Sequence, residues 1–423
     1  MIHLKKSAPA LAAIALCTLL TRSTMPAAGP IACDPENGGL TLPTGFCALV
    51  VANNIGEGRH AAAAPNGDLY VALLNGGIAA LRDTNGDGRF ETIEHFGDGS
   101  STGLEFHDGY LYVAKVNSVE RYKMTPGQLK PAGAAEVVVS GLPGEREHGD
   151  KDIAFDDKGS LYVNIGAPSN DCQVRNRTKG SPGQDPCPIL EQHGGIWKFS
   201  DSKPGQTLQD GVRYATGMRQ MPAIDWHNGK LYVVMNSRDQ LDVLYPDKFT
   251  AEENATRPAE PMYRIDEQGD NFGWPYCFWD YTMNKLLLQP EYGGDGKTVG
   301  RCSQYKVPIT SFPAHWAPVD LKFYTGTQFP APYRNGAFIA FHGSWNRAPL
   351  PQEPSNVTFQ AFNGEQPSGK FEIFASGFAG KAQITNSNDV AARADGVAQA
   401  PDGSLFITES QKGKVWRVFY RGK

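Results

Sequence analysis

A short pattern of apolar and polar positions recurs along the whole chain. Each copy has a short apolar strand, a turn that carries Gly with Asn or Asp, and a second strand in which Tyr or Phe alternates with Val or Ile. Alternation on both sides of such a turn is typical of a β-hairpin. The copies, the last of them stretched, begin at Arg59, Ser101, Asp150, Arg219, Ala394 and Ala317.

Strand repeats spaced more than 40 residues apart predict a β-propeller. A parallel sheet would need helical patterns between the strands, and few are visible. Six copies therefore predict an all-β fold, a six-bladed β-propeller with four-stranded antiparallel blades around a central channel. We expect one domain over residues 29–423, in which a last strand within residues 413–423 pairs with N-terminal residues and closes the ring.

The first residues have the pattern of a secretory signal peptide. Lys5 and Lys6 precede an apolar stretch of roughly a dozen residues, and small residues follow near Ala27 and Ala28. The stretch is too short to span a bilayer, and no later segment has the roughly eighteen apolar residues that a membrane helix needs. We expect residues 1–28 to be removed and the protein to be secreted or periplasmic, with no membrane span.

Composition narrows the possible partners. The chain has 423 residues, 47 Gly, 30 Pro and a formal charge of −5, which describes a folded, loop-rich protein. It has no long run of Lys or Arg, so it lacks the charge pattern of a nucleic-acid or anionic-membrane binder.

Outside the signal peptide, an even number of cysteines indicates disulfides in an oxidising compartment. Sequence alone leaves fifteen pairings open, and we expect nearest neighbours to pair. Metal ligation is disfavoured because no CxxC pair exists, and no CxxCH motif for attached haem is present. The expected pairs are Cys33 with Cys47, Cys172 with Cys187, and Cys277 with Cys302.

The residues just before the repeated strands are candidates for a ligand site. In a propeller, loops that enter the first strand of each hairpin meet at one mouth of the channel. These positions hold Arg59, His148, Arg219 and Arg393. Guanidinium groups bind carboxylates and phosphates through paired hydrogen bonds, so such a ring suits a small polyanion. Singly, each arginine could equally bridge blades or face solvent.

Several segments resemble the glucose/sorbosone dehydrogenase family, most distinctively "HGSWNR" and "NFGWPYC". The similarity runs from about Gly38 to the C-terminus. It implies a six-bladed propeller that binds pyrroloquinoline quinone (PQQ) and calcium, oxidises a small sugar, and passes electrons to a separate acceptor, a cytochrome or a quinone.

The resemblance also implies roles for particular residues. His148 matches the general base of the soluble glucose dehydrogenase branch, and the backbone carbonyls of Ser237 and Arg238 match its calcium ligands. Where that branch has a cofactor-binding lysine, this chain has "FHGSWNR", which looks more like the sorbosone and pyranose dehydrogenase branch and makes His342 a rival base. The implied cofactor-binding residues are Arg59, Arg219, Gln220 (in place of an asparagine), Asn236, His342, Arg347 and Arg393.

A separate stretch, "DTNGDGRFETIE", fits the spacing of a calcium-binding loop. Asp83, Asn85, Asp87 and Glu94 would supply hard oxygen ligands. The flanking residues are not helical, so a plain Asp/Gly-rich turn between strands is an equally good reading.

Two other functions remain open. A calcium-dependent sugar lactonase would need carboxylate and asparagine ligands in the channel, whereas the axial positions here are rich in Arg and His. A non-enzymatic binding propeller is the other, since Gln220 departs from the family pattern. The sugar is not evident; we expect long insertions at residues 167–195 and 282–306 to roof the channel mouth.

Overall fold

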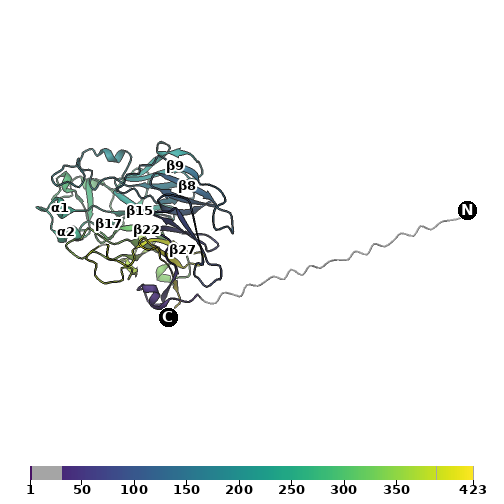
Figure 1. Ribbon diagram of the computed structural model, residues 1–423. Helices are drawn as coiled ribbons and strands as arrows, with labels where there is room; N and C mark the ends of the chain where they lie inside the picture. Colours follow the sequence, from purple (N-terminus) through teal and green to yellow (C-terminus); the bar gives the residue numbers. More distant parts are fainter. Residues whose placement is uncertain (2–30, 387, 423) are drawn as a thin grey trace.

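The computed structural model describes residues 1, 31–386 and 388–422. The expected signal peptide, residues 1–28, lies outside the described residues apart from Met1. The described chain is built mostly of short strands arranged around a centre (Figure 1).

Six small sheets carry one repeat copy each, in chain order, and the predicted six-bladed β-propeller is confirmed. Strands of blades one to three are β2 (Gly58–Ala63), β3 (Leu69–Leu73), β4 (Ile78–Arg82) and β5 (Thr92–Phe96); β6 (Ser101–His107), β7 (Tyr110–Lys115), β8 (Ser118–Lys123) and β9 (Glu136–Ser140); and β10 (Ile153–Phe155), β11 (Ser160–Ile165), β12 (Gly195–Ser200) and β14 (Val212–Thr216). Strands of blades four to six are β15 (Gln220–His227), β16 (Lys230–Asn236), β17 (Glu260–Ile265) and β21 (Thr310–Phe312); β22 (Pro318–Phe323), β23 (Gly336–Phe341), β24 (Asn356–Asn363) and β26 (Glu372–Ala375); and β27 (Ala394–Gln399), β28 (Leu405–Glu409), β29 (Val415–Tyr420) and β1 (Phe46–Ala52).

The first strands of the blades line the axis. Each of β2, β6, β10, β15, β22 and β27 contacts the next in this order, and β27 contacts β2. This closed ring of contacts requires the loops before these strands to meet at one end of the channel, which is the arrangement that the sequence predicted.

Blade six combines the two ends of the described chain. β1 pairs antiparallel with β29, with Phe46 opposite Tyr420 and Val50 opposite Trp416. In Figure 1 the C-terminus lies beside the first, purple part of the described chain. The predicted closure by N-terminal residues is therefore confirmed.

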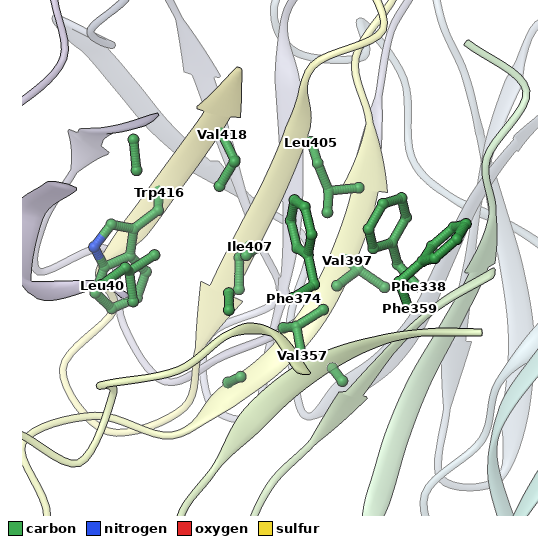
Figure 2. Close-up of a cluster of buried hydrophobic side chains, with 14 of the residues drawn as sticks. Leu40, Phe338, Val357, Phe359, Phe374, Val397, Leu405, Ile407, Trp416 and Val418 are labelled. Atoms are coloured by element: carbon green, nitrogen blue, oxygen red, sulfur yellow. The ribbon is translucent and has the colours of Figure 1, made fainter. Parts of the chain in front are cut away.

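The core is divided among the blade interfaces. Six buried apolar clusters each combine side chains of two neighbouring sheets. Figure 2 shows the cluster between blades five and six, where rings of β23, β24 and β26 pack on β27 and β28: Phe338, Phe359, Phe374, Val397, Leu405 and Ile407. Because burial joins adjacent sheets, each blade depends on its neighbours for stability.

Three of these interfaces, between blades three and four, four and five, and five and six, also carry a polar link near the axis. The Oδ2 atom of Asp152 accepts the Ile224 N–H at 2.9 Å, and Asp320 Oδ2 accepts the Val397 N–H at 2.7 Å. Asp225 Oδ2 likewise accepts the Phe323 N–H at 2.8 Å. Each carboxylate joins its blade to the next, so these aspartates have a structural role.

Connections outside the repeat add short edge strands, one hairpin and short helical segments. Blades two, three and five gain the two-residue edge strands β13 (Gln206–Thr207), β18 (Asp270–Asn271) and β25 (Gln366–Pro367), so not every blade has four strands. A separate hairpin joins β19 (Cys277–Asp280) and β20 (Lys285–Leu288). The helical segments are α1 (Leu241–Leu244), α2 (Ala251–Thr256), and the 3₁₀ turns Pro35–Gly39, Pro188–Glu191, Leu208–Asp210, Pro290–Tyr292, Gly300–Gln304 and Ala331–Tyr333.

Three disulfides join the cysteines as predicted from nearest neighbours: Cys33 with Cys47, Cys172 with Cys187, and Cys277 with Cys302. The second and third bonds lie in one apolar cluster with Trp274 and Tyr276. The two long insertions are thus fastened together beside the channel. Within the described residues, no helix is long and apolar enough to cross a membrane.

Candidate active site

A cavity of about 320 Å³ opens at the end of the channel where the first strands of the blades begin. Its walls come from the start of β2, the loop before β10, both ends of the β15–β16 hairpin, and the loops on either side of the β22–β23 hairpin. Blades one, three, four and five therefore contribute to one site. Its size falls in the range of small-molecule sites.

Most of the residues predicted for the site line this cavity, and three do not. The lining residues are Arg59, His148, Arg219, Gln220, Asn236, Ser237 and His342. Arg238, Arg347 and Arg393 lie behind the lining, where their side chains hold other parts of the chain.

Arg59 is held between two carboxylates at the start of blade one. Its Nη1 donates to Asp395 at 2.9 Å and its Nη2 donates to Asp150. Asp395 is fully buried, and burial raises the pKa of its carboxyl to about 6 although Arg59 opposes the shift. These two bonds leave the Nε–H of Arg59 buried without a partner among the described residues.

Arg219 is anchored in the same way on the opposite side of the cavity. Its Nη2 donates to Asp239 at 2.7 Å and to Asn170 at 3.0 Å, and its side chain is 3% exposed. Arg219 and Arg177 hold the pKa of Asp239 down to about 2 despite burial. The Nε–H of Arg219 and the Oε1 of neighbouring Gln220 are also buried without partners in the described chain.

These unpartnered atoms favour a ligand site at this cavity. A buried polar group without a hydrogen bond is costly, so native proteins keep few of them. Two orphaned guanidinium donors and one orphaned amide oxygen lie on residues that line a single cavity. A ligand with several oxygen acceptors, such as a polycarboxylate, would satisfy the two donors.

His148 lies on the cavity wall with a defined tautomer. Its Nδ1 is 2.5 Å from the carbonyl oxygen of Ala167, which can only accept a hydrogen bond. Nδ1 therefore carries the proton and Nε2 keeps its lone pair. Burial and the charge of Arg219 lower the pKa of His148 to about 4, so the ring is neutral at physiological pH.

His342, the rival base, is bound differently. Its Nε2 lies 2.7 Å from Ser410 Oγ and 3.8 Å from a carboxylate oxygen of Asp395. Burial, Arg59 and Arg393 lower its pKa to about 3. Both imidazoles are thus neutral, but Nε2 of His342 is already engaged by a hydroxyl group.

The loop after β16 brings hard oxygen atoms to the cavity. The Ser237 N–H donates to Glu260 Oε2 at 2.7 Å, and Asp239 lines the cavity beside them. Burial raises the pKa of Glu260 to about 8. Backbone and carboxylate oxygens of this kind suit calcium, and a cation bound here would favour the ionised form of Glu260.

Arg238 anchors the same loop through two buried ion pairs. Its side chain is fully buried and pairs with Asp171 at 3.1 Å and with Glu291 at 2.8 Å. Asp171 belongs to the first long insertion and Glu291 to the second. Arg347 donates to the carbonyl oxygens of Ala255 and Pro351, and Arg393 donates to the carbonyl oxygen of His342.

The candidate calcium loop lies away from this cavity. Asp83, Asp87 and Glu91 place carboxylate oxygens within 4.8 Å of one another. Glu94 lies in β5 opposite Ala80 and pairs with Lys130 at 2.6 Å instead. Strand β5 begins directly after Glu91, so the loop ends before Glu94 and the spacing of a helix-flanked calcium loop does not apply. Glu91 is therefore the carboxylate that lies beside Asp83 and Asp87, where Glu94 was expected.

The sequence interpretation missed several lining residues: Arg146, Asp150, Asp239, Glu260, His315 and Trp345. Asp150 could have been found, because it occupies the first position of its repeat copy as Arg59 does. His315 and Glu260 lie outside the repeated hairpins, and no pattern marks them. His315 donates from Nε2 to the Asn254 carbonyl oxygen at 2.7 Å.

The fold and the cavity define the chain as a six-bladed β-propeller with an arginine- and histidine-lined ligand site at one end of its channel. The chain belongs to the TrAA12-like family, whose model matches residues 40–421.

Solved structures share the fold of this chain. The calcium structure of Trichoderma reesei Carbohydrate-Active Enzymes Family AA12 has a TM-score of 0.72 at 18% identity, covering 90% of this chain and 97% of that one. The holo form of the pyranose dehydrogenase PQQ domain from Coprinopsis cinerea has a TM-score of 0.68 at 17% identity, again over 90% and 97% of the two chains. Likeness at these identities shows the fold.

Among curated proteins, a pyrroloquinoline quinone-dependent pyranose dehydrogenase from Coprinopsis cinerea is 24% identical over 192 residues. The match covers 40% of this chain and 26% of that protein. The resemblance to PQQ-dependent sugar dehydrogenases that the motifs indicated is therefore confirmed.

Proposed function

We propose that this chain is an exported PQQ- and calcium-dependent sugar dehydrogenase that oxidises an aldose or sorbosone-type sugar. The observation that carries the proposal is the pair of buried, unpartnered guanidinium donors on Arg59 and Arg219 in one open cavity. PQQ carries three carboxylates and a quinone, so it offers acceptors for both. The names of the relatives support the same chemistry.

The residues that would hold the cofactor are Arg59, Arg219, Gln220 and Asn236, with His342 at the edge. When bound, PQQ supplies a two-electron acceptor that takes a hydride from the sugar, and calcium polarises the quinone. Ser237 and Arg238 would offer backbone oxygens to that calcium. Asp239 and Glu260 add negative charge beside it.

His148 is the residue that we assign as general base. The carbonyl oxygen of Ala167 fixes its ring and leaves Nε2 free to accept the proton of the sugar hydroxyl. His342 remains the alternative, although its Nε2 already contacts Ser410. Electrons would leave through a separate acceptor, a cytochrome or a quinone.

Two further proposals concern the rest of the molecule. The three disulfides favour an oxidising compartment, which supports export. The cluster of Asp83, Asp87 and Glu91 is a candidate structural calcium loop, with Asn85 beside it.

Cofactor binding is the decisive measurement. Purified, calcium-loaded protein should bind PQQ with one-to-one stoichiometry at micromolar concentration, followed by quinone absorbance, and should then oxidise aldoses with an artificial electron acceptor. Absence of stoichiometric binding would refute the proposal. If calcium-dependent hydrolysis of a sugar lactone were then observed, the lactonase reading would replace it; binding without oxidation would leave a binding propeller.

The pH dependence of kcat/KM should reflect a histidine with a lowered pKa. The base works only when neutral, and burial with Arg219 lowers the pKa of His148 to about 4. Activity should therefore persist as pH falls through 6.5, the usual histidine value, and decline only toward pH 4. A fall in kcat/KM with an apparent pKa of 6.5 or above would contradict the lowered pKa of the base.

A further inference from the structure

We propose that the natural substrate is an acidic sugar, an aldose that carries a carboxylate, and that Arg146 binds this carboxylate while Trp345 packs on the sugar ring. The inference rests on the proposed function and adds the substrate class. It comes from two exposed side chains at the cavity mouth that the cofactor site does not use.

Arg146 is an arginine of the cavity lining for which the described residues offer no partner. Three arginines line the cavity, and the other two, Arg59 and Arg219, are buried in ion pairs. Among the described residues, Arg146 makes no hydrogen bond or ion pair, and its side chain is exposed.

The neighbours of Arg146 make this isolation notable. It lies between two glutamates, and each is paired with a different side chain. Glu145 pairs with His193 at 2.9 Å, and Glu147 pairs with Arg177 at 2.6 Å. The loop thus contains two carboxylates that could neutralise Arg146, and both are directed elsewhere.

Exposure separates Arg146 from the proposed cofactor ligands. Arg59 and Arg219 have side chains only 12% and 3% exposed, whereas Arg146 is an exposed residue at the rim. A cofactor held by the buried pair would lie deeper in the cavity, so Arg146 is positioned for the molecule that enters after it.

Arg146 lies close enough to His148 for a single sugar ring to contact both side chains. Only one residue, Glu147, lies between Arg146 and His148, so their Cα atoms are at most about 7 Å apart. A hexuronate carries its carboxylate on C5, which is joined to the anomeric carbon through the ring oxygen, so the carboxylate and the anomeric hydroxyl lie on neighbouring parts of one ring. A single ring can therefore reach Arg146 with its carboxylate while its anomeric hydroxyl lies near His148.

Trp345 supplies an apolar surface at the same mouth. Its side chain is 56% exposed, which is unusual for tryptophan, and it lines the cavity from the loop after β23. Aromatic faces carry negative charge density and attract the weakly positive C–H groups of a pyranose. A ligand on Trp345 would also cover an indole ring that is otherwise exposed to solvent.

The reaction balances for such a sugar. Oxidation at C1 of the ring form breaks the C–H bond, with its hydride passing to the quinone cofactor, and breaks the O–H bond, with its proton passing to Nε2 of His148. The product is a lactone that keeps its carboxylate, and the two electrons leave to the separate acceptor.

The test compares acidic and neutral sugars on the PQQ- and calcium-loaded protein. We expect kcat/KM for glucuronate or galacturonate to exceed that for glucose or galactose at least tenfold, and the preference to shrink in 0.5 M salt because exposed charges are screened. Arg146→Gln should lower the ratio of the two kcat/KM values at least tenfold. Arg175→Gln removes an exposed arginine that does not line the cavity, and it should preserve the ratio.

Binding gives a second readout without turnover. Glucarate, which has no reducing end, should bind the PQQ- and calcium-loaded protein in a calorimetric titration, and Arg146→Gln should raise its dissociation constant at least tenfold. Trp345→Ala should raise KM for acidic and neutral sugars alike.

Three outcomes would overturn the inference: equal use of uronates and neutral aldoses, a preference for glucose 6-phosphate over glucuronate, or a tenfold loss of PQQ affinity in Arg146→Gln. The last would make Arg146 a cofactor ligand. Failure of the wild-type protein to bind PQQ would instead refute the proposed function, so the two failures are distinguishable.

Discussion

Replacing His148 with alanine is expected to lower turnover of the PQQ-loaded protein by about 10² to 10⁴, the usual contribution of a general base. The expectation follows from the tautomer: the bond from Nδ1 to Ala167 leaves the Nε2 lone pair available, and the lowered pKa keeps it unprotonated. PQQ affinity should change little, because the orphaned donors belong to Arg59 and Arg219. Single-turnover reduction of the bound cofactor by sugar measures this step directly.

His342→Ala is the matched comparison. This residue also lines the cavity and has a lowered pKa, but its Nε2 contacts Ser410. We expect a smaller fall in the single-turnover rate than for His148→Ala. Normal reduction by His148→Ala together with loss in His342→Ala would transfer the role of base to His342.

Arg238→Met is expected to destabilise the fold by about 3–5 kcal/mol. Arg238, Asp171 and Glu291 are all fully buried at their side chains, and removing the cation leaves two buried acidic groups without their partner. Urea unfolding with the disulfides intact measures the effect. The penalty should grow above about pH 8: burial raises the pKa of Asp171 to about 8 even with Arg238 beside it, and loss of the cation raises this pKa further, so only above that pH does the variant lose stability that the unsubstituted protein keeps.

Two variants test this explanation. Arg301→Met breaks an ion pair with Asp185 in which both partners are more than a third exposed, and it should cost at most about 1 kcal/mol. Combining Arg238→Met with Asp171→Asn and Glu291→Gln removes the buried charges together and should recover part of the loss. An equal cost in the combined variant would show that Arg238 acts through packing alone.

The fold could be predicted largely because one hairpin pattern repeats. The copies beginning at Arg59 and Arg219 alternate apolar and polar residues around a turn, and this periodicity fixed both the strand type and the number of blades. The hairpin formed by β19 and β20 was not foreseen. Its residues are apolar at successive positions and so lack the alternation of the repeat. Trp279 and Leu286 pack in the disulfide cluster rather than against a blade.

The candidate site was predictable only where it follows the repeat. Arg59 and Arg219 precede their strands in the same register, so topology alone brings them together. Arg393 has this register too, yet its guanidinium supports the His342 backbone, because side-chain direction does not follow from sequence position. Glu260 meets the site through β17, and such a contact depends on packing that sequence does not encode locally.

The pairing of β1 with β29 bears on how the protein could be made. The last strand of the final blade leaves the ribosome after every other strand, so the ring stays open until synthesis of that strand ends. An open ring exposes the apolar faces that blade six would cover, and folding waits for a contact between distant parts of the chain. Late closure of this kind would favour the proposed export, because a chain whose ring is still open has not completed its fold.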